Sequence, residues 1–187
     1  MRFSALLIAG LYALVQADHD APVVNENPNV IYEATLPKEP FFHGNLHGNV
    51  EGYVRASRGP HGTGVKFEVQ FHNFPKEGGP FLYHIHVNPV PSDGNCTKTL
   101  AHLDPYGRGE DPPCDASAPE TCQVGDLSGK YGKPRGRPFY AEYVDPFTSL
   151  TEGTDAFFGN RSIVVHFANK TRITCANFEK IPGCSAH

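Results

Sequence analysis

The chain has 187 residues and a formal net charge of −4, and it contains 19 Gly, 17 Pro and five Cys. This length suits one domain with a sizeable core, and the weakly acidic balance without a large basic cluster argues against a nucleic-acid-binding protein. A small group of positive charges is typical of a solvated loop: Lys130, Lys133, Arg135 and Arg137.

The first 17 residues have the pattern of a secretory signal peptide. Arg2 precedes an apolar stretch from Ala5 to Val15, and Val15-Gln16-Ala17 ends in a small residue at a spacing suited to cleavage. The apolar stretch is too short to span a bilayer, and we expect no transmembrane helix. A secreted protein, extracellular or associated with the cell wall, follows. The expected parts are a signal peptide, an N-terminal extension, one domain and a C-terminal tail at 1–17, 18–28, 29–180 and 181–187.

Short runs of β-branched and aromatic residues, separated by dense Gly and Pro, predict an all-β domain. Val65 to Phe71 alternates apolar and polar residues, as in a half-buried antiparallel strand. Strands are predicted at 29–35, 48–56, 64–71, 81–87, 139–143, 162–167 and 172–178. The long loop from Val87 to Phe139 needs cross-links or a bound metal to hold it. We predict a β-sandwich or flattened barrel with its function on this loop.

The five cysteines favour two disulfides and one remaining thiol in an oxidising compartment. Cys114 and Cys122 could close the long loop locally, whereas Cys96 and Cys175 would tie it to the last strand. Cys184 is the expected odd one, although the spacing leaves the connectivity open. Three N-x-S/T motifs fit a glycosylated, secreted protein: Asn95, Asn160 and Asn169.

The strongest functional signal is Tyr83-His84-Ile85-His86. Side chains alternate on a strand, so His84 and His86 point to the same side, roughly 6.5–7 Å apart. Two converging imidazoles are half of a copper or zinc site. His102, in the loop after Cys96, and His166, which ends an apolar run and needs a partner if buried, are the further candidates. The other six are expected to be structural or solvent-facing: His19, His43, His47, His61, His72 and His187.

Taken together, these motifs resemble the copper/zinc superoxide dismutase family, in a pattern from about Val50 to Phe178. Further short segments carry the resemblance: 124–127 and 162–178. Arg172-Ile173-Thr174-Cys175 is similar to the family's active-site arginine followed three residues later by the disulfide cysteine. The resemblance implies a Greek-key barrel of eight antiparallel strands and a Cys96–Cys175 disulfide. It implies these copper ligands: His84, His86, His102 and His166.

Two departures resemble the fungal copper-only superoxide dismutases, which are extracellular and often attached to the cell wall. In zinc-bearing relatives, the residue at His102 bridges two metals, and two further histidines and an aspartate hold zinc. No histidine lies between His102 and Asp126, and one aspartate is too few for zinc. The loop between His166 and Arg172 is also cut to five residues, which leaves the active site open.

The resemblance implies an enzyme that converts superoxide into O₂ and hydrogen peroxide with one copper and no zinc, and we expect a monomer. Arg172 would attract superoxide through its permanent charge, and His102 would carry a proton. Without zinc, another group must orient the His102 ring, and Asp126 and Gln123 are the candidates. We assign this role to Asp126, because a glutamine cannot take up charge; its alternative role is to cap the turn that follows it.

A non-catalytic protein that binds or delivers copper on the same fold is the alternative function. Both readings use the same four histidines. Turnover also needs Arg172 and a proton path at His102, whereas storage does not. Their presence favours the enzyme.

Overall fold

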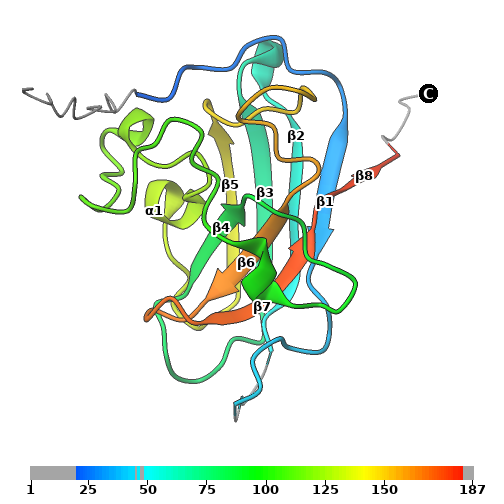
Figure 1. The fold of residues 1–187 in the computed structure, drawn as a ribbon, viewed down its shortest axis with the longest axis vertical. Coiled ribbons are helices and arrows are strands. Elements are labelled where there is room, and N and C mark those ends of the chain that lie inside the picture. Colours follow the sequence, from blue (N-terminus) through cyan, green and yellow to red (C-terminus); the bar gives the residue numbers. More distant parts are fainter. Residues whose placement is uncertain (1–19, 45, 47–48, 183–187) are drawn as a thin grey trace, which may run out of the picture.

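The computed structural model describes residues 20–44, 46 and 49–182, in which eight strands form two antiparallel sheets packed face to face (Figure 1). The predicted signal peptide and Cys184 lie outside the described residues. In sheet order, the five-stranded sheet contains β5 (Phe139–Asp145), β3 (Val65–His72), β2 (Glu51–Arg58), β1 (Ile31–Thr35) and β8 (Glu179–Ile181). The three-stranded sheet contains β4 (Leu82–His86), β6 (Ser162–His166) and β7 (Arg172–Asn177). The predicted all-β sandwich is confirmed.

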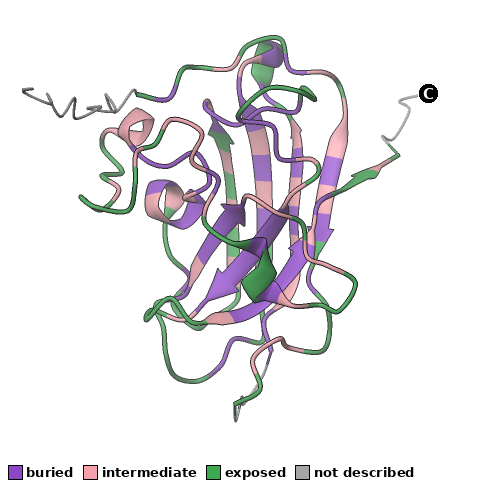
Figure 2. Ribbon diagram, in the orientation of Figure 1, coloured by how far each residue is buried: buried purple, intermediate pink, exposed green. Residues whose placement is uncertain are grey.

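The core lies between the two sheets; in Figure 2, β4, β6 and β7 are mostly coloured as buried, whereas the strands of the larger sheet change colour along their length. Alternation in β3 places Phe67, Val69 and Phe71 in this core, as predicted from their period of two. β6 is buried along its whole length because β4 and β7 flank it and material packs on both of its faces. The strand that carries two of the histidines therefore pairs with the most enclosed strand of the smaller sheet.

Two elements were not predicted. β8 pairs with β1 after the chain crosses from one sheet to the other at Phe178, and α1 (Leu127–Tyr131) is a single short helix in the long loop. This loop also contains 3₁₀ helices at Cys96–Thr99 and Pro119–Thr121. The segment is thus ordered by short local structure, by α1 packing on β4 and by disulfides.

Both disulfides of the long loop are present. Cys96–Cys175 joins the 3₁₀ helix Cys96–Thr99 to β7, and Cys114–Cys122 closes an eight-residue separation within the loop. The first of these bonds packs with Val164 on the outer face of the small sheet. The loop is therefore attached covalently to the sheet that carries the histidines.

Lys130 differs from the sequence expectation of a solvated loop. Its side chain is fully buried, and its Nζ donates to Asp145 Oδ2 at 2.5 Å and to the Val124 carbonyl at 2.9 Å. Asp145 also accepts from Tyr131 Oη. A buried charge needs such partners, and here they attach α1 to the end of β5. The other three basic residues of the group are exposed: Lys133, Arg135 and Arg137.

None of the helices in the described segments is long and apolar enough to cross a membrane.

Candidate metal centre

Backbone pairing along β4 brings three segments to one place. His84 and His86 lie on β4, and His166 ends β6 beside it. On the other edge of β4, Leu103 N–H donates to the Ile85 carbonyl, which places His102 opposite His86 in an isolated antiparallel bridge. The chain can approach here because of Gly125: a Cβ at this position would lie 2.4 Å from the Ile85 oxygen.

The four histidines predicted to bind metal form one cluster. Each offers a ring nitrogen, and these nitrogens all lie within 4.8 Å of one another. The ring centroids of His84 and His102 are 3.9 Å apart, and those of His84 and His86, on the same strand face, are 6.4 Å apart. His84, His86 and His166 are buried, and His102 is partly exposed.

Carbonyl partners fix the protonated nitrogen of two rings. A carbonyl oxygen only accepts, so His86 Nδ1 carries the proton that it donates to the Leu100 oxygen at 2.8 Å, and His166 Nδ1 does the same toward the Lys170 oxygen at 2.9 Å. The Nε2 atoms of these two rings face each other at 3.2 Å. Each then presents only a lone pair, and a shared cation satisfies both.

His102 is oriented by Gln123. Its Nδ1 lies 2.7 Å from Gln123 Oε1, and the amide of Gln123 is itself oriented because its Nε2 donates to Asp104 Oδ2 at 3.1 Å. Asp104 in turn accepts from the backbone N–H groups of Arg108 and Gly109. This series of hydrogen bonds places the proton of His102 on Nδ1 and leaves Nε2 without one. The structure therefore differs from the expectation that Asp126 orients this ring.

Asp126 lies against His84 instead. His84 Nε2 is 3.3 Å from Asp126 Oδ1 and 3.1 Å from Ser128 Oγ. The same Asp126 oxygen accepts from Gly129 N–H at 2.7 Å and caps α1, so the capping alternative holds as well. His84 Nδ1 is buried and has no hydrogen-bond partner among the described residues. A buried ring nitrogen in this state calls for a ligand.

Burial keeps three rings of the cluster neutral at physiological pH, those of His86, His102 and His166. Burial, followed by the charges of His166 and His102, lowers the pKa of His86 to about 2. Burial and His84 lower the pKa of His166 to about 3. The same two causes lower the pKa of His102 to about 4, although its hydrogen bond to Gln123 acts in the opposite direction. The lone pairs are thus available without loss of a proton.

The carboxylate beside His84 remains ionised. Burial by itself raises the pKa of Asp126, but the hydrogen bond and charge of His84 and the N–H of Gly129 outweigh it and lower this pKa to about 2. Ionised Asp126 keeps the proton of His84 on Nε2, so Nδ1 has a lone pair that can coordinate a metal ion.

These observations fit a metal ion with imidazole ligands. Four lone pairs converge, three on Nε2 atoms and one on His84 Nδ1, and the rings are held by groups on their far sides. Neutral imidazole suits copper and zinc alike, and hydrogen bonds that orient the rings are typical of such centres.

Arg172 is placed at the start of β7, beside the cluster. Its Nη2 donates to the Leu100 carbonyl at 2.6 Å, while its Nε is buried without a hydrogen-bond partner among the described residues. Arg172 lines a surface hollow of about 330 Å³ with Lys170 and His43. A fixed guanidinium with a free donor is suited to a small anion.

The short connection from β6 to β7 is a tight turn. Phe167 N–H donates to the Thr171 carbonyl, and Lys170 N–H donates to that of Phe167. On the other side of Lys170, a cavity of about 230 Å³ reaches His84 and His102. The turn is therefore too short to cover the rings with a wall of its own.

The predicted glycosylation sites differ in environment. Asn160 and Asn169 are exposed, whereas Asn95 is half-buried and caps the 3₁₀ helix Cys96–Thr99 by accepting from Thr97 N–H. Asn169 lies on the turn between β6 and β7, close to Lys170 and Arg172 in the chain.

Four residues at the site were not anticipated from the sequence: Asp104, Ser128, Leu100 and Lys170. Asp104 and Ser128 act through side chains that could have been sought as small polar residues near His102 and Asp126. Leu100 acts through its carbonyl, in a left-handed conformation with φ of 63°. No side-chain pattern signals that role.

No family model matches the chain. A curated protein of Arthroderma benhamiae named "Cell surface Cu-only superoxide dismutase" is 39% identical over 98% of this chain and 56% of its own length. "Cell surface Cu-only superoxide dismutase 5" of Candida albicans is 33% identical over 95% of this chain and 72% of its own length. The chain thus spans little more than half of the first of these relatives.

The solved structures agree on the fold. Superoxide dismutase 5 of Candida albicans, in its Cu(II) form, superimposes with a TM-score of 0.71 at 31% identity, over 86% of this chain and 97% of that one. The match therefore includes nearly the whole of the solved relative.

Proposed function

The chain belongs to the fungal cell-surface superoxide dismutase family, and we propose that it is an extracellular, copper-dependent superoxide dismutase. The observation that carries the proposal is the combination of four converging imidazole lone pairs with an arginine whose Nε lacks a partner. The names of the relatives, which include cell surface and Cu-only, support the location and the metal. We further propose that it is a monomer, that residues 1–17 are a signal peptide, and that Asn95, Asn160 and Asn169 are glycosylation sites.

One copper per chain, without zinc, would be held by His84 Nδ1 and by the Nε2 atoms of His86, His102 and His166. Bound there, copper would supply one-electron redox chemistry, by which one superoxide would be oxidised to O₂ and a second, with two protons, reduced to hydrogen peroxide. The donor set supports this assignment because imidazole suits both oxidation states of copper.

The surrounding residues would set the position of each ring. Leu100 and Lys170 carbonyls hold two rings, Gln123 holds a third, and Asp126 with Ser128 holds the fourth. Gln123 replaces, for His102, the support that zinc gives in zinc-bearing relatives. Its amide oxygen accepts a hydrogen bond from Nδ1–H and stays neutral, so His102 Nε2, whenever it is not bound to copper, would be the atom that takes up and returns a proton.

Arg172 would bring superoxide to the site. Its Nη2 donates to the Leu100 carbonyl, which fixes the side chain, and its permanent positive charge would attract the anion. The net charge of −4 gives no attraction by the protein as a whole, and the attraction must be local.

The test uses the secreted protein, prepared with and without added copper. We expect copper, with about one ion per chain, and a superoxide dismutation rate that appears on copper loading. Equimolar zinc that survives dialysis would contradict the metal assignment. Full copper loading without turnover would favour the alternative, a copper-binding or delivery protein.

A further inference from the structure

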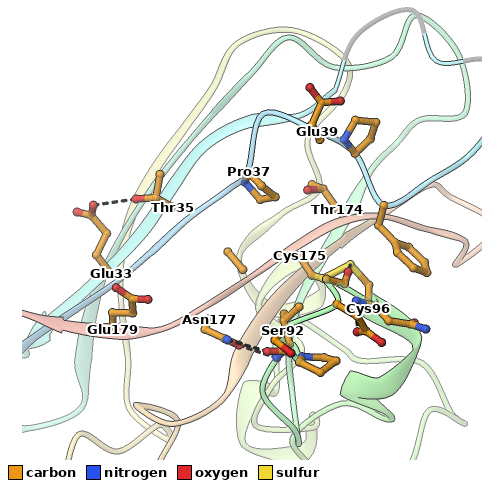
Figure 3. A pocket seen from close by; sticks show the side chains of 18 of the residues that line it. Glu33, Thr35, Pro37, Glu39, Ser92, Cys96, Thr174, Cys175, Asn177 and Glu179 are labelled. Carbon is orange, nitrogen blue, oxygen red and sulfur yellow. Dashed lines mark hydrogen bonds between the residues drawn. A yellow bond between two sulfur atoms is a disulfide. The ribbon is translucent and has the colours of Figure 1, made fainter.

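A groove of about 830 Å³ lies at the side of the sandwich between β1, β7 and β8, within the size range of ligand sites (Figure 3). Two loops, 37–43 and 90–96, complete its walls. The four clustered histidines and Arg172 do not line it. The groove is therefore separate from the proposed copper site.

The groove is acidic. Its lining contains neither Lys nor Arg, and four carboxylates line it: Glu33, Glu39, Asp93 and Glu179. Glu33 is paired with Arg55 at 2.7 Å and Asp93 with Lys98 at 2.6 Å. Glu39 and Glu179 have no cationic partner in the described part of the chain, and Glu179 stands directly opposite Glu33 in the β1–β8 register. Arg55 already neutralises Glu33 of this pair, so Glu179 and Glu39 are the carboxylates left for a basic ligand.

One wall is the stretch Cys175 to Asn177 on the edge of β7 away from β6; earlier on this edge, the Ile173 carbonyl already accepts from Phe41 and Phe42 N–H. The backbone N–H and C=O of Ile85 bond to Gly125 and Leu103, on the edge of β4 away from β6. The backbone groups of Ile163, which stands opposite Ile85, therefore point away from β4 and toward Ala176 of β7. By alternation, the N–H and C=O groups of Cys175 and Asn177 face the groove. Within the described residues, no backbone group pairs with them.

A buried hydroxyl adds a third feature. Thr174 lines the groove, is 0% exposed, and its Oγ1 has no hydrogen-bond partner in the described segments. Figure 3 shows Thr174 and Cys175 along the β7 wall and Glu33 and Glu179 together at the left. A polar atom buried without a partner costs stability unless a ligand supplies one.

We propose that this groove binds an extended, Lys- or Arg-rich peptide segment of a partner protein, which adds as a strand to the edge of β7. Backbone pairing with Cys175 and Asn177 supplies the main-chain hydrogen bonds, and alternate basic side chains reach Glu39 and Glu179. A second copy of this chain is a poorer occupant. A two-fold contact between identical patches would bring the carboxylates of both copies together.

The test uses the copper-loaded, enzymatically deglycosylated protein, so that a glycan at Asn95 on the groove rim cannot interfere. The probe is a labelled octapeptide of alternating Lys and Val, with two control peptides: a Glu-Val octapeptide and a Lys-Val octapeptide with N-methylated alternate amides. Fluorescence anisotropy measures affinity, and hydrogen exchange measures protection of the Cys175 and Asn177 amides. We expect binding of the first peptide alone, with slower exchange at both amides.

Charge variants locate the binding. Glu39→Gln and Glu179→Gln should each weaken binding about threefold, and Glu152→Gln, an exposed carboxylate of another loop with the same charge change, should not. None of these changes should alter superoxide turnover, so the result is independent of the proposed enzyme activity. Equal loss in all three variants, equal binding of the N-methylated peptide, or a concentration-dependent dimer that Glu179→Gln disrupts would overturn the proposal.

Discussion

Arg172 and His86 are joined through one acceptor, the carbonyl oxygen of Leu100. Arg172 Nη2 lies 2.6 Å from it and His86 Nδ1 lies 2.8 Å from it. Leu100 holds this position with a positive φ, a conformation that is costly for a residue with a side chain, and its side chain is 56% exposed. The guanidinium that we propose attracts the anion and a proposed copper ligand are thus positioned by the same atom.

Replacement of Arg172 should separate attraction of the anion from binding of the metal. Arg172→Glu should lower the superoxide dismutation rate about tenfold or more at low salt and leave the copper content unchanged, because the charge is reversed without removal of a ligand. Arg135→Glu makes the same charge change at an exposed position and serves as the control. A rate in R172E equal to that of the control would remove Arg172 from the mechanism.

Gln123 should control the protonation of His102. Gln123→Leu removes the acceptor of the Nδ1 proton, so the ring loses its orientation, and we expect a lower rate with an altered pH profile. Gln123→Glu places a carboxylate in contact with Nδ1 and should make Nε2 more basic. Its pH profile should then shift to higher pH relative to the parent protein. Stopped-flow rates across pH provide the measurement, and unchanged profiles in both variants would contradict this role.

Asp126 has two functions that can be distinguished by substitution. Asp126→Ala removes both the cap of α1 and the acceptor for His84 Nε2, and it should lower copper affinity about 10- to 100-fold. Asp126→Ser keeps a capping oxygen but removes the charge. We expect D126S to recover helix stability and not copper affinity, as measured by competition with a chelator. Recovery of both would assign Asp126 to capping alone.

The histidine cluster predicts how the metal-free protein responds to acid. An unfolded histidine takes up a proton below its ordinary pKa of 6.5, but the folded cluster does so only near pH 4 for His102 and near pH 3 for His166. Protons therefore favour the unfolded chain. Stability should be complete above pH 6.5 and fall as the pH drops toward 4, by up to about 1.4 kcal/mol per pH unit for each histidine.

Denaturant unfolding of the metal-free protein at several pH values measures this slope. His61→Asn, at an exposed position outside the cluster, serves as the control and should leave it unchanged. Asp126 acts in a separate window, because its stabilisation is lost only as the pH falls below about 3.8 toward 2. A stability that is constant from pH 7 to pH 5 would contradict the protonation states assigned to the cluster.

The buried ion pair between Lys130 and Asp145 should be important for folding. Lys130→Met leaves the Asp145 carboxylate buried without its cation, and we expect a loss of about 3–5 kcal/mol in the free energy of unfolding. Lys133→Met, at an exposed position three residues later, should change it by less than about 0.5 kcal/mol. Similar unfolding midpoints for the two variants would show that the pair is dispensable.

The sequence predicts the strands best where a residue pattern is local. Seven strands follow from apolar alternation and Gly or Pro boundaries, and His84 and His86 follow from strand geometry alone. β8 is three residues long, and its pairing with β1 depends on a crossing between sheets that no local pattern encodes. The burial of Lys130 likewise depends on Asp145, which is distant in sequence and supplied by another element.

The assignment of Asp126 shows a second limit. Gln123 and Asp126 are three residues apart, and the sequence identifies both as neighbours of the histidines. Which ring each one contacts depends on how the chain turns at Gly125, where close packing against Ile85 and Leu103 directs the two side chains to different rings. Chemical preference for a carboxylate therefore did not identify the partner of His102.

The Cys96–Cys175 disulfide joins the two segments that carry Leu100 and Arg172. Leu100 follows Cys96 by four residues, and Arg172 precedes Cys175 by three. In a newly synthesised chain with reduced thiols, Arg172 and the Leu100 carbonyl would lie on segments that no covalent bond yet joins. We expect that oxidative maturation, rather than synthesis, determines when the protein first becomes competent. Gentle reduction of loaded protein should then slow turnover before any copper is released, and simultaneous loss of both would refute this order.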